Sequence, residues 1–584
     1  MHSLIRIAKG VCLLLFASFA HIALADVIPG TGSLTGAVTA DTPFQAAKVY
    51  ARNAERHMAY LVYTTKGRYR AINLMPGTYE VTVEKPGFAT EARKIVVKAG
   101  ATQTVDFTLR TDRSPAAPGK LTASYEEIYP PGAGRDILER TCSMCHGKSF
   151  IAQRAGLDAD GWNALITVMT SQRVPGTDIP TLPPGLITDE TRPVLVDYLT
   201  RHLGPGTPAR ELRTDDSTEL DESALASAMW IQYSVPQPKT SAGTWRKFQE
   251  PYFDMDGNVW VTEPSPKAPA IAKLDPRTQK WTLFPLPNVG WYPHGITVDP
   301  VDGAVWWAGR GVDVGRLDPK TGKHKAYGDL SDTQRWGGHT PVFDSRGDLW
   351  YTLLYQSAFG KWDRKTDSVT HYGTPNKGGK PYGALIDQED RFVASELAGC
   401  RLTRFDPKKE EFKEFISPSA PCYNRRPGID SKGRLWYGVF NAGKLGMVEP
   451  ETGKITEYLI DRFAEPYEAS SDPYDNIWMS DGGRGGVLVR FNPETKRFTN
   501  YPGLETTDMP KIAISREGAV WYTNRGAAAR GHAPAAIGVL YPNMDLMTSF
   551  GAYYDVKDGR AVGNGSPIQA RRPAAAAAQQ SGSR

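Results

Sequence analysis

The C-terminal half of the chain, from about Trp245 to Leu546, contains an internal repeat that restricts the possible folds more than any other feature. One large aromatic residue recurs in a single register, as Trp260, Trp306, Trp350, Phe392, Trp436, Trp478 and Trp521. The spacings are 46, 44, 42, 44, 42 and 43 residues. Repeats of this length, made of short strands, are typical of propeller blades, and seven copies close into a ring. The sequence therefore predicts a seven-bladed β-propeller over residues 230–550.

A second marker follows each aromatic residue and supports the division into blades. It is an acidic or polar residue before proline in most copies, for example Asp275-Pro276, Asp318-Pro319 and Asp406-Pro407. Several copies continue as Pro-x-Thr-Gly, a turn suited to joining the last two strands of a blade. The segment Trp230 to Val235 reads as one more outer strand. We expect it to close the ring by pairing with the last blade.

The motif Cys142-Ser143-Met144-Cys145-His146 is the C-x-x-C-H pattern of c-type haem attachment. Cys142 and Cys145 would bind the haem vinyl groups covalently, and His146 would be the proximal iron ligand. Half of a zinc site and a thioredoxin-type redox pair are the alternatives. Zinc would need further nearby ligands, which do not follow, and a redox pair would not need the adjacent histidine. The motif therefore predicts a haem c cofactor.

The residues around this motif change from strand to helix periodicity. Asp158 is a suitable N-cap for a helix that places Trp162, Ile166 and Met169 on one face, and Thr188 opens a further helix. Residues 132–205 resemble a small class I cytochrome c domain. Met169 is the expected sixth ligand of the haem iron, with core filling as the alternative role. His202 is the main rival ligand.

The N-terminus has the features of a secretion signal, which covalent haem attachment requires. A basic start precedes an apolar run from Val11 to Ala20, and a small-x-small cleavage pattern ends at Ala25. Residues 1–25 are therefore predicted to be a cleaved signal peptide, and the mature protein to be periplasmic or secreted, with no membrane span. The formal charge of +5 and the lack of a basic run give no indication of nucleic-acid binding.

Cysteine usage adds one structural expectation. Cys12 lies in the predicted signal peptide, and Cys142 and Cys145 are the predicted sites of haem attachment. Only Cys400 and Cys422 then remain. An oxidising compartment favours a disulfide between them. Two buried free thiols are the alternative.

Residues 27–111 alternate apolar and polar positions in short runs separated by glycine and proline turns, which indicates a small β-sandwich. The stretch from Gly67 to Val81, followed by Pro86-Gly87-Phe88, resembles the carboxypeptidase regulatory-like family. That resemblance implies a prealbumin-like sandwich used for adhesion or spacing. The complete expectation is a mainly β chain with this sandwich, a small helical cytochrome domain and the propeller, joined by linkers at 112–131 and 206–229, with a tail at 551–584.

The first repeat, Asp256 to Glu263 followed by Ile271 to Pro276, resembles the streptogramin B lyase family of propellers. The family resemblance implies catalysis by a histidine and a glutamate of one blade with a magnesium ion. Here His294 and His339 occupy the histidine register, but Gly309 and Leu353 stand at the matching glutamate positions.

Glu263 keeps the family's glutamate in the first blade, where Gln249 or Glu250 replaces the histidine. No single blade therefore carries the pair. A base and its partner from neighbouring blades, His294 and Glu263, are the remaining arrangement for an elimination.

The register also predicts a ring of polar and cationic side chains at one mouth of the propeller. Its members are His294, His339, Tyr382, Arg425, Tyr467 and Lys511. Such a mouth suits a polar or anionic small molecule, although polar residues also line any wet channel.

Three functions follow from these features. The first is a periplasmic haem protein in electron transfer with a redox partner protein, coupled to a ligand of the propeller. The second is a streptogramin-type lyase with an accessory haem domain, and the third is a scaffold subunit. An elimination transfers no net electrons, so the presence of a haem domain favours the first.

Overall fold

The computed structural model describes most of the chain outside its termini and several loops. The described residues are 28–89, 91–112, 121–144, 151–152, 154–171, 182, 185–212, 219–236, 248–265, 268–328, 336–419, 422–484, 486–504, 509–524, 535–557 and 560–562. The predicted signal peptide, and Cys145 and His146 of the haem motif, lie outside these residues. Among the described residues, no helix is long and apolar enough to cross a membrane.

The N-terminal strands form a two-layer sandwich, as predicted. One sheet contains β1 (Gly32–Ala40), β4 (Arg68–Leu74), β7 (Thr102–Thr104) and β8 (Phe107–Leu109). The other contains β2 (Lys48–Asn53), β3 (Met58–Tyr63), β5 (Gly77–Glu84) and β6 (Glu91–Val97). Alternate residues of these strands, such as Tyr79, Val81 and Val83, are fully buried between the layers.

Seven blades of the predicted propeller are present in the described part of the chain. Blade 1 contains β12 (Pro251–Phe253), β13 (Val259–Glu263), β14 (Ala270–Asp275) and β15 (Lys280–Pro285). Blade 2 contains β16 (Tyr292–Val298), β17 (Val305–Arg310), β18 (Val312–Leu317) and β19 (His324–Tyr327). Blade 3 contains β20 (Gly338–Phe343), β21 (Leu349–Leu353), β22 (Ala358–Asp363) and β23 (Ser368–Gly373). Blade 4 contains β24 (Pro381–Ile386), β25 (Phe392–Glu396), β26 (Arg401–Asp406) and β27 (Glu411–Ile416).

The remaining blades follow the same order from the innermost strand outward. Blade 5 contains β28 (Asn424–Ile429), β29 (Leu435–Val439), β30 (Lys444–Val448) and β31 (Ile455–Leu459). Blade 6 contains β32 (Pro466–Ser471), β33 (Ile477–Asp481), β34 (Val487–Asn492) and β35 (Arg497–Pro502). The short helix η3 (Phe440–Ala442) interrupts blade 5. Blade 7 contains β36 (Ile512–Ile514), β37 (Val520–Asn524) and β38 (Ala536–Tyr541).

The repeated aromatic residue lies on the second strand of every blade, and its burial explains the register. In four blades the indole N–H donates to an aspartate of the preceding turn. The pairs are Trp260 with Asp254 (2.8 Å), Trp350 with Asp344 (3.1 Å), Trp436 with Asp430 (2.9 Å) and Trp478 with Asp472 (2.8 Å). Each such bond gives a buried polar atom its partner, so the large ring is buried at low cost.

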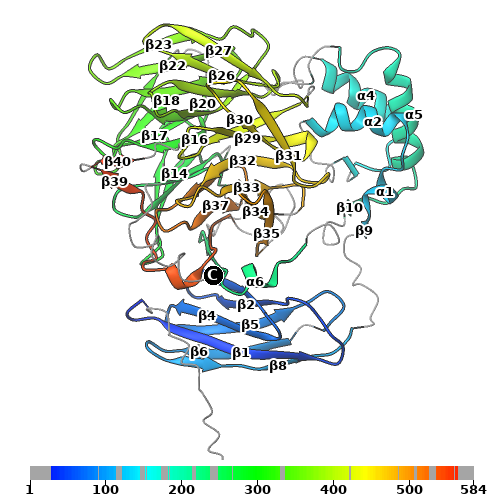
Figure 1. Ribbon diagram of the computed structural model, residues 1–584, viewed down its shortest axis with the longest axis vertical. Helices are drawn as coiled ribbons and strands as arrows, with labels where there is room; N and C mark the ends of the chain where they lie inside the picture. The colour runs from blue at the N-terminus through cyan, green and yellow to red at the C-terminus, as the bar shows by residue number, and fades with distance from the viewer. Residues whose placement is uncertain are drawn as a thin grey trace, which may run out of the picture.

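The ring closes as expected, and the closure extends into the sandwich. β11 (Met229–Ser234) pairs with β38 and is the outermost strand of blade 7. Its other edge pairs with β3, for example Trp230 with Leu61, so blade 7 and one layer of the sandwich form a single eight-stranded sheet. Figure 1 shows the sandwich next to this part of the propeller. The sandwich is therefore packed onto the propeller and is not only tethered to it.

A helical module follows the sandwich and precedes the propeller along the chain. It contains β9 (Leu121–Ala123), α1 (Tyr125–Ile128), α2 (Ala133–Arg140), η1 (Cys142–Met144), α4 (Ala159–Thr170), α5 (Thr191–Leu203) and β10 (Arg210–Leu212). Asp158 caps α4 as predicted, accepting from the N–H of Gly161. Helices α2 and α5 cross closely at Gly134, where a Cβ atom would lie 2.2 Å from Cβ of Tyr198. Figure 1 shows these helices gathered on one side of the propeller.

Several predicted boundaries differ from the structure. β9 and α1 lie within the expected linker 112–131, and β10 and α6 (Glu222–Leu225) lie within the expected linker 206–229. β9 and β10 pair in parallel, so the two stretches join each other at the base of the helical module. Helix α5 begins three residues after Thr188, whose hydroxyl accepts from the N–H of Thr191.

The expected tail also begins later than predicted. Tyr554 is buried against Tyr252 and Phe253 of blade 1. The elements that follow blade 7 are η4 (Met544–Leu546), β39 (Asp555–Lys557) and β40 (Arg560–Val562).

Candidate functional site

Seven side chains, one from each blade, meet at one end of the propeller channel and form what we term the mouth ring. Six are those expected from the register, and the seventh is Glu250, which precedes the inner strand of blade 1. The members in blade order are Glu250, His294, His339, Tyr382, Arg425, Tyr467 and Lys511. All are buried, with at most 9% of any residue exposed. The mouth ring is therefore a closely packed group of side chains.

Contacts between neighbours run around most of the mouth ring. The rings of His294 and His339 have centroids 4.1 Å apart, and those of His339 and Tyr382 also lie 4.1 Å apart. The Tyr382 and Tyr467 hydroxyls are hydrogen-bonded at 2.6 Å. On the other side, Nζ of Lys511 lies 3.6 Å from Oε2 of Glu250. Each side chain is thus held by its neighbours.

Arg425 occupies an aromatic cage within the mouth ring. Its guanidinium carbon lies 4.2 Å from the ring centroid of Phe440, 4.6 Å from that of Tyr467 and 5.3 Å from that of Tyr382. Cation–π attraction of this kind holds a cation at low dielectric without neutralising its charge. Arg425 therefore keeps a positive field at the mouth.

The two histidines of the mouth ring have different hydrogen-bonding states. For His294, Nε2 lies 3.0 Å from the amide nitrogen of Gln249, and Nδ1 lies 3.2 Å from Oε1 of Glu250. The expected partner Glu263 is at the end of the second strand of blade 1, one strand further from the channel. The structure thus pairs His294 with Glu250, a combination that the family pattern did not indicate.

His339 is anchored through one nitrogen. Its Nδ1 lies 3.0 Å from the Thr340 hydroxyl, which can donate or accept, and 3.2 Å from the Tyr382 carbonyl, which can only accept. Burial lowers the pKa of His339 well below its usual value, and the neighbouring His294 and Arg426 lower it further. The imidazole is therefore neutral, and one of its two ring nitrogens is a hydrogen-bond acceptor.

A second layer of charges lies one residue deeper in the channel. Arg426 forms an ion pair with Glu250 across the channel and donates to the Thr340 hydroxyl (2.8 Å). Burial alone would raise the pKa of Glu250, but Arg426 and Lys511 lower it to about 2. Burial also raises the pKa of Glu468 to about 7, against the attraction of Lys511 and Arg426. Together these groups form a buried charge network that includes Glu250 and Lys511 of the mouth ring.

The turn that is expected to attach haem lies close to the mouth ring. η1, which carries Cys142, is next to η3 of blade 5. Met169 at the end of α4 packs in the same apolar cluster as Tyr382, Phe440 and Tyr467. Cys142 itself is half-buried and packs against the apolar core of the helical module. The structure therefore brings two expected haem residues to the propeller mouth.

The helical module has a second anchor on the propeller. Arg462, in the connection between blades 5 and 6, forms an ion pair with Glu126 of α1. The ring of the adjacent Phe463 lies 5.0 Å from that of Tyr125. His202, the rival iron ligand, is half-buried in α5 next to Tyr198, with ring centroids 4.7 Å apart. It is not part of the cluster that contains Met169.

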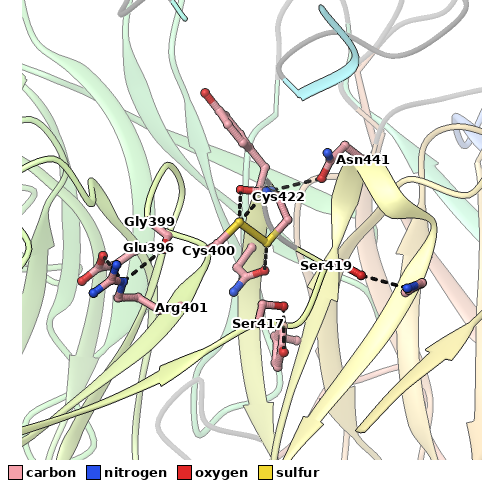
Figure 2. Close-up of a disulfide and its surroundings, with 12 residues drawn as sticks. Glu396, Gly399, Cys400, Arg401, Ser417, Ser419, Cys422 and Asn441 are labelled. Atoms are coloured by element: carbon pink, nitrogen blue, oxygen red, sulfur yellow. Dashed lines mark hydrogen bonds and ion pairs between the residues drawn. A yellow bond between two sulfur atoms is a disulfide. The ribbon is translucent and has the colours of Figure 1, made fainter. Parts of the chain in front are cut away.

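Cys400 and Cys422 form a disulfide between blades 4 and 5. Cys422 leads into the inner strand that carries Arg425, and the next residue, Tyr423, donates its N–H to Oδ1 of Asn441 in η3 (3.1 Å). Figure 2 shows the disulfide with Asn441 beside it. The disulfide therefore anchors the part of blade 5 that contributes to the mouth ring.

The expected magnesium ion has no ligand cluster among the described residues. No three His, Cys, Asp or Glu side chains in this part of the chain lie close enough together to hold a metal ion. The mouth ring offers one carboxylate, Glu250, which is already paired with Arg426 and Lys511. The magnesium expectation therefore rests on the sequence resemblance alone.

Comparison with known proteins identifies one module by family. Residues 33–110 match the carboxypeptidase regulatory-like domain. No curated protein sequence matches the chain.

Among solved structures, a streptogramin B lyase is similar, with 20% identity, a TM-score of 0.46, and coverage of 54% of this chain and 97% of the lyase. Virginiamycin B lyase from Staphylococcus aureus has 19% identity and a TM-score of 0.47, covering 54% and 99%. The WD40 propeller domain of Doa1 has 11% identity and a TM-score of 0.42, covering 55% and 99%. The propeller assignment rests on the strand pairing described above.

Proposed function

We propose that this chain is an exported c-type haem protein, periplasmic or secreted, that transfers electrons between a redox partner protein and a polar or anionic small molecule bound at the mouth ring. One observation supports it most directly. Met169, the expected axial ligand, packs in one cluster with Tyr382 and Tyr467 of the mouth ring. A ligand at the mouth and a haem in the helical module would therefore be neighbours.

The donor atoms present fit a covalently bound haem. Cys142 offers a thiol at the edge of an apolar core, and Met169 offers a half-buried thioether. The sequence supplies the second thiol and the proximal imidazole, Cys145 and His146. A haem bound by these groups would supply a one-electron redox centre, and thioether ligation raises its reduction potential.

The mouth ring determines which ligand would bind. Arg425, Arg426 and Lys511 are cationic, whereas Glu250 is the carboxylate held ionised among them. Because burial holds the pKa of Glu468 near 7, that group only partly offsets the remaining positive charge. The neutral imidazole of His339 offers one nitrogen that can accept a hydrogen bond. An anionic ligand with a hydroxyl or amine group matches this arrangement.

The test begins with the full exported protein. Its reduced spectrum should show the α-band of a c-type cytochrome, and its absence would contradict the haem assignment. Oxidised protein is then mixed with a panel of hydroxy acids, phenolic acids and neutral analogues while the α-band is recorded. Haem reduction by an anionic compound, lost in Arg425→Gln but kept in the surface variant Arg201→Gln, is the expected result.

A second candidate is an elimination of the streptogramin lyase kind. It is favoured by one observation, the neutral imidazole of His339 next to the cationic groups of the mouth ring. The absence of the family's histidine–glutamate pair within one blade opposes it. Opening of a depsipeptide lactone with magnesium, without any change in the haem spectrum, would support the lyase over electron transfer.

A further inference from the structure

The contact between the helical module and the propeller involves the residues that are expected to bind haem. We infer that the propeller supplies one wall of the haem pocket, with Phe440 of η3 as the side chain that contacts the haem. This inference rests on the proposed function, because it requires that haem is attached at Cys142. It makes the propeller part of the haem environment, so that haem and mouth ligand share a boundary.

The position of the attachment cysteine is the first support. A thioether bond would hold one edge of the macrocycle at Sγ of Cys142, so the macrocycle must occupy space next to η1. The element of the propeller that lies next to η1 is η3. Phe440 is the first residue of η3 and is 95% buried, with 5% of its surface exposed.

The position of Met169 is the second support. Met169 packs against an apolar cluster that contains Phe440, Tyr423 and Leu354 of the propeller, whereas Trp162 and Ile166 of the same helix pack in the core of the helical module. The expected axial ligand and the expected attachment turn thus both approach the part of the propeller that contains η3. A macrocycle held by both would have Phe440 beside it.

The surroundings of Phe440 connect this wall to the mouth ring. On one side the guanidinium of Arg425 lies 4.2 Å from its ring centroid. Its ring also meets that of Tyr467 edge-on, with centroids 5.9 Å apart. One aromatic side chain therefore separates the cation of the mouth from the helical module. Charge bound at Arg425 would act on the haem through a short, water-excluded path, where electrostatic effects are strong.

The experiment compares Phe440→Ala with Phe412→Ala in the purified full-length holoprotein. Phe412 is a half-buried phenylalanine on β27, the outer strand of blade 4, and serves as the matched control. Two properties are measured, the midpoint potential of the haem and the rate at which added imidazole binds the oxidised iron. We expect Phe440→Ala to shift the potential and to raise the imidazole rate by about tenfold, because a cavity replaces a wall. Phe412→Ala should change neither.

The outcomes separate this inference from the proposed function. Wild-type protein without haem would overturn both. Wild-type protein with haem, and Phe440→Ala with an unchanged potential and imidazole rate, would overturn only the propeller wall. If Phe440→Ala does not fold, Phe440→Leu retains apolar volume but removes the ring, and the same two measurements decide.

Discussion

The guanidinium of Arg426, on the inner strand of blade 5, forms an ion pair with the carboxylate of Glu250, which precedes the inner strand of blade 1. Both side chains are buried, so the two charges compensate each other, and Nζ of Lys511 lies 3.6 Å from the same carboxylate. The pair joins opposite parts of the propeller at the mouth ring. It therefore connects the stability of the propeller to the geometry of the candidate site.

Removing one partner of this pair should destabilise the protein strongly. We expect Glu250→Gln to lower the free energy of unfolding by about 3 kcal/mol, because the charge of Arg426 is left buried without its partner. The double variant Glu250→Gln with Arg426→Met should be more stable than the sum of the two single variants predicts. Urea unfolding measures these values. Asp197→Asn, which breaks an exposed pair with Arg201 on α5, should have little effect, and equal losses in both would contradict the prediction.

Glu468 should make stability depend on pH in a predictable direction. Burial raises its folded-state pKa to about 7, from a usual value of 4.5. As pH rises from about 4.5 to about 7, the unfolded state loses this proton first, so ionisation favours unfolding. The free energy of unfolding of the wild type, minus that of Glu468→Gln, should therefore fall by up to about 3 kcal/mol over this range.

Urea titrations of the wild type and Glu468→Gln at pH 5 and pH 8 test this expectation. Glutamine keeps an oxygen that can accept from the N–H of Ile512, now bonded to Glu468 at 3.1 Å. The titrations of Glu250 and other groups are common to both proteins and cancel in the difference. Parallel stabilities at the two pH values would show that Glu468 titrates normally in the folded protein.

The sandwich and blade 7 should unfold in a single transition. Leu61 of β3 is fully buried in one cluster with Trp230 and Trp478 of the propeller. Leu61→Ala should cost about 2–5 kcal/mol and shift the melting of both modules together. Differential scanning calorimetry measures this shift, and Val194→Ala on the exposed surface of α5 is the control. A separate early transition for the sandwich would contradict the prediction.

The disulfide should stabilise the propeller in a way that depends on the redox state. Cys400 and Cys422 are separated by 22 residues, so the link restricts the unfolded chain by about 3 kcal/mol. Cys400→Ser with Cys422→Ser should lower the melting temperature and abolish its dependence on added reductant. A wild-type melting temperature that does not respond to reductant would show that the bond does not contribute.

Repetition explains why the blades could be predicted from the sequence. Trp260 and its equivalents fill the same position in each blade, and their size and turn aspartates leave a strong periodic signal. Glu250 lacked such a signal because the resemblance predicts a histidine at that position, and the sequence offered Gln249 and Glu250 equally. Its place became clear only from its contacts with His294, Arg426 and Lys511.

The contacts between modules had no sequence signal. β3 and β11 pair through backbone groups at sheet edges, which any residue can provide. Met169 was predicted to lie on the apolar face of a helix, and that pattern does not distinguish the core of its own module from another surface. Its position against Tyr382 and Tyr467 depends on how two folded modules dock.

Met169 provides the last prediction, on ligation of the iron. If its thioether is the sixth ligand, Met169→Leu should lower the midpoint potential and change the spectrum of the oxidised haem, because thioether ligation raises the potential. Met169→His should keep a six-coordinate iron at a lower potential still. His202→Phe is the control, since His202 lies beside Tyr198 and outside the cluster that joins Met169 to the mouth ring. An unchanged potential in Met169→Leu together with a changed one in His202→Phe would assign the iron ligand to His202.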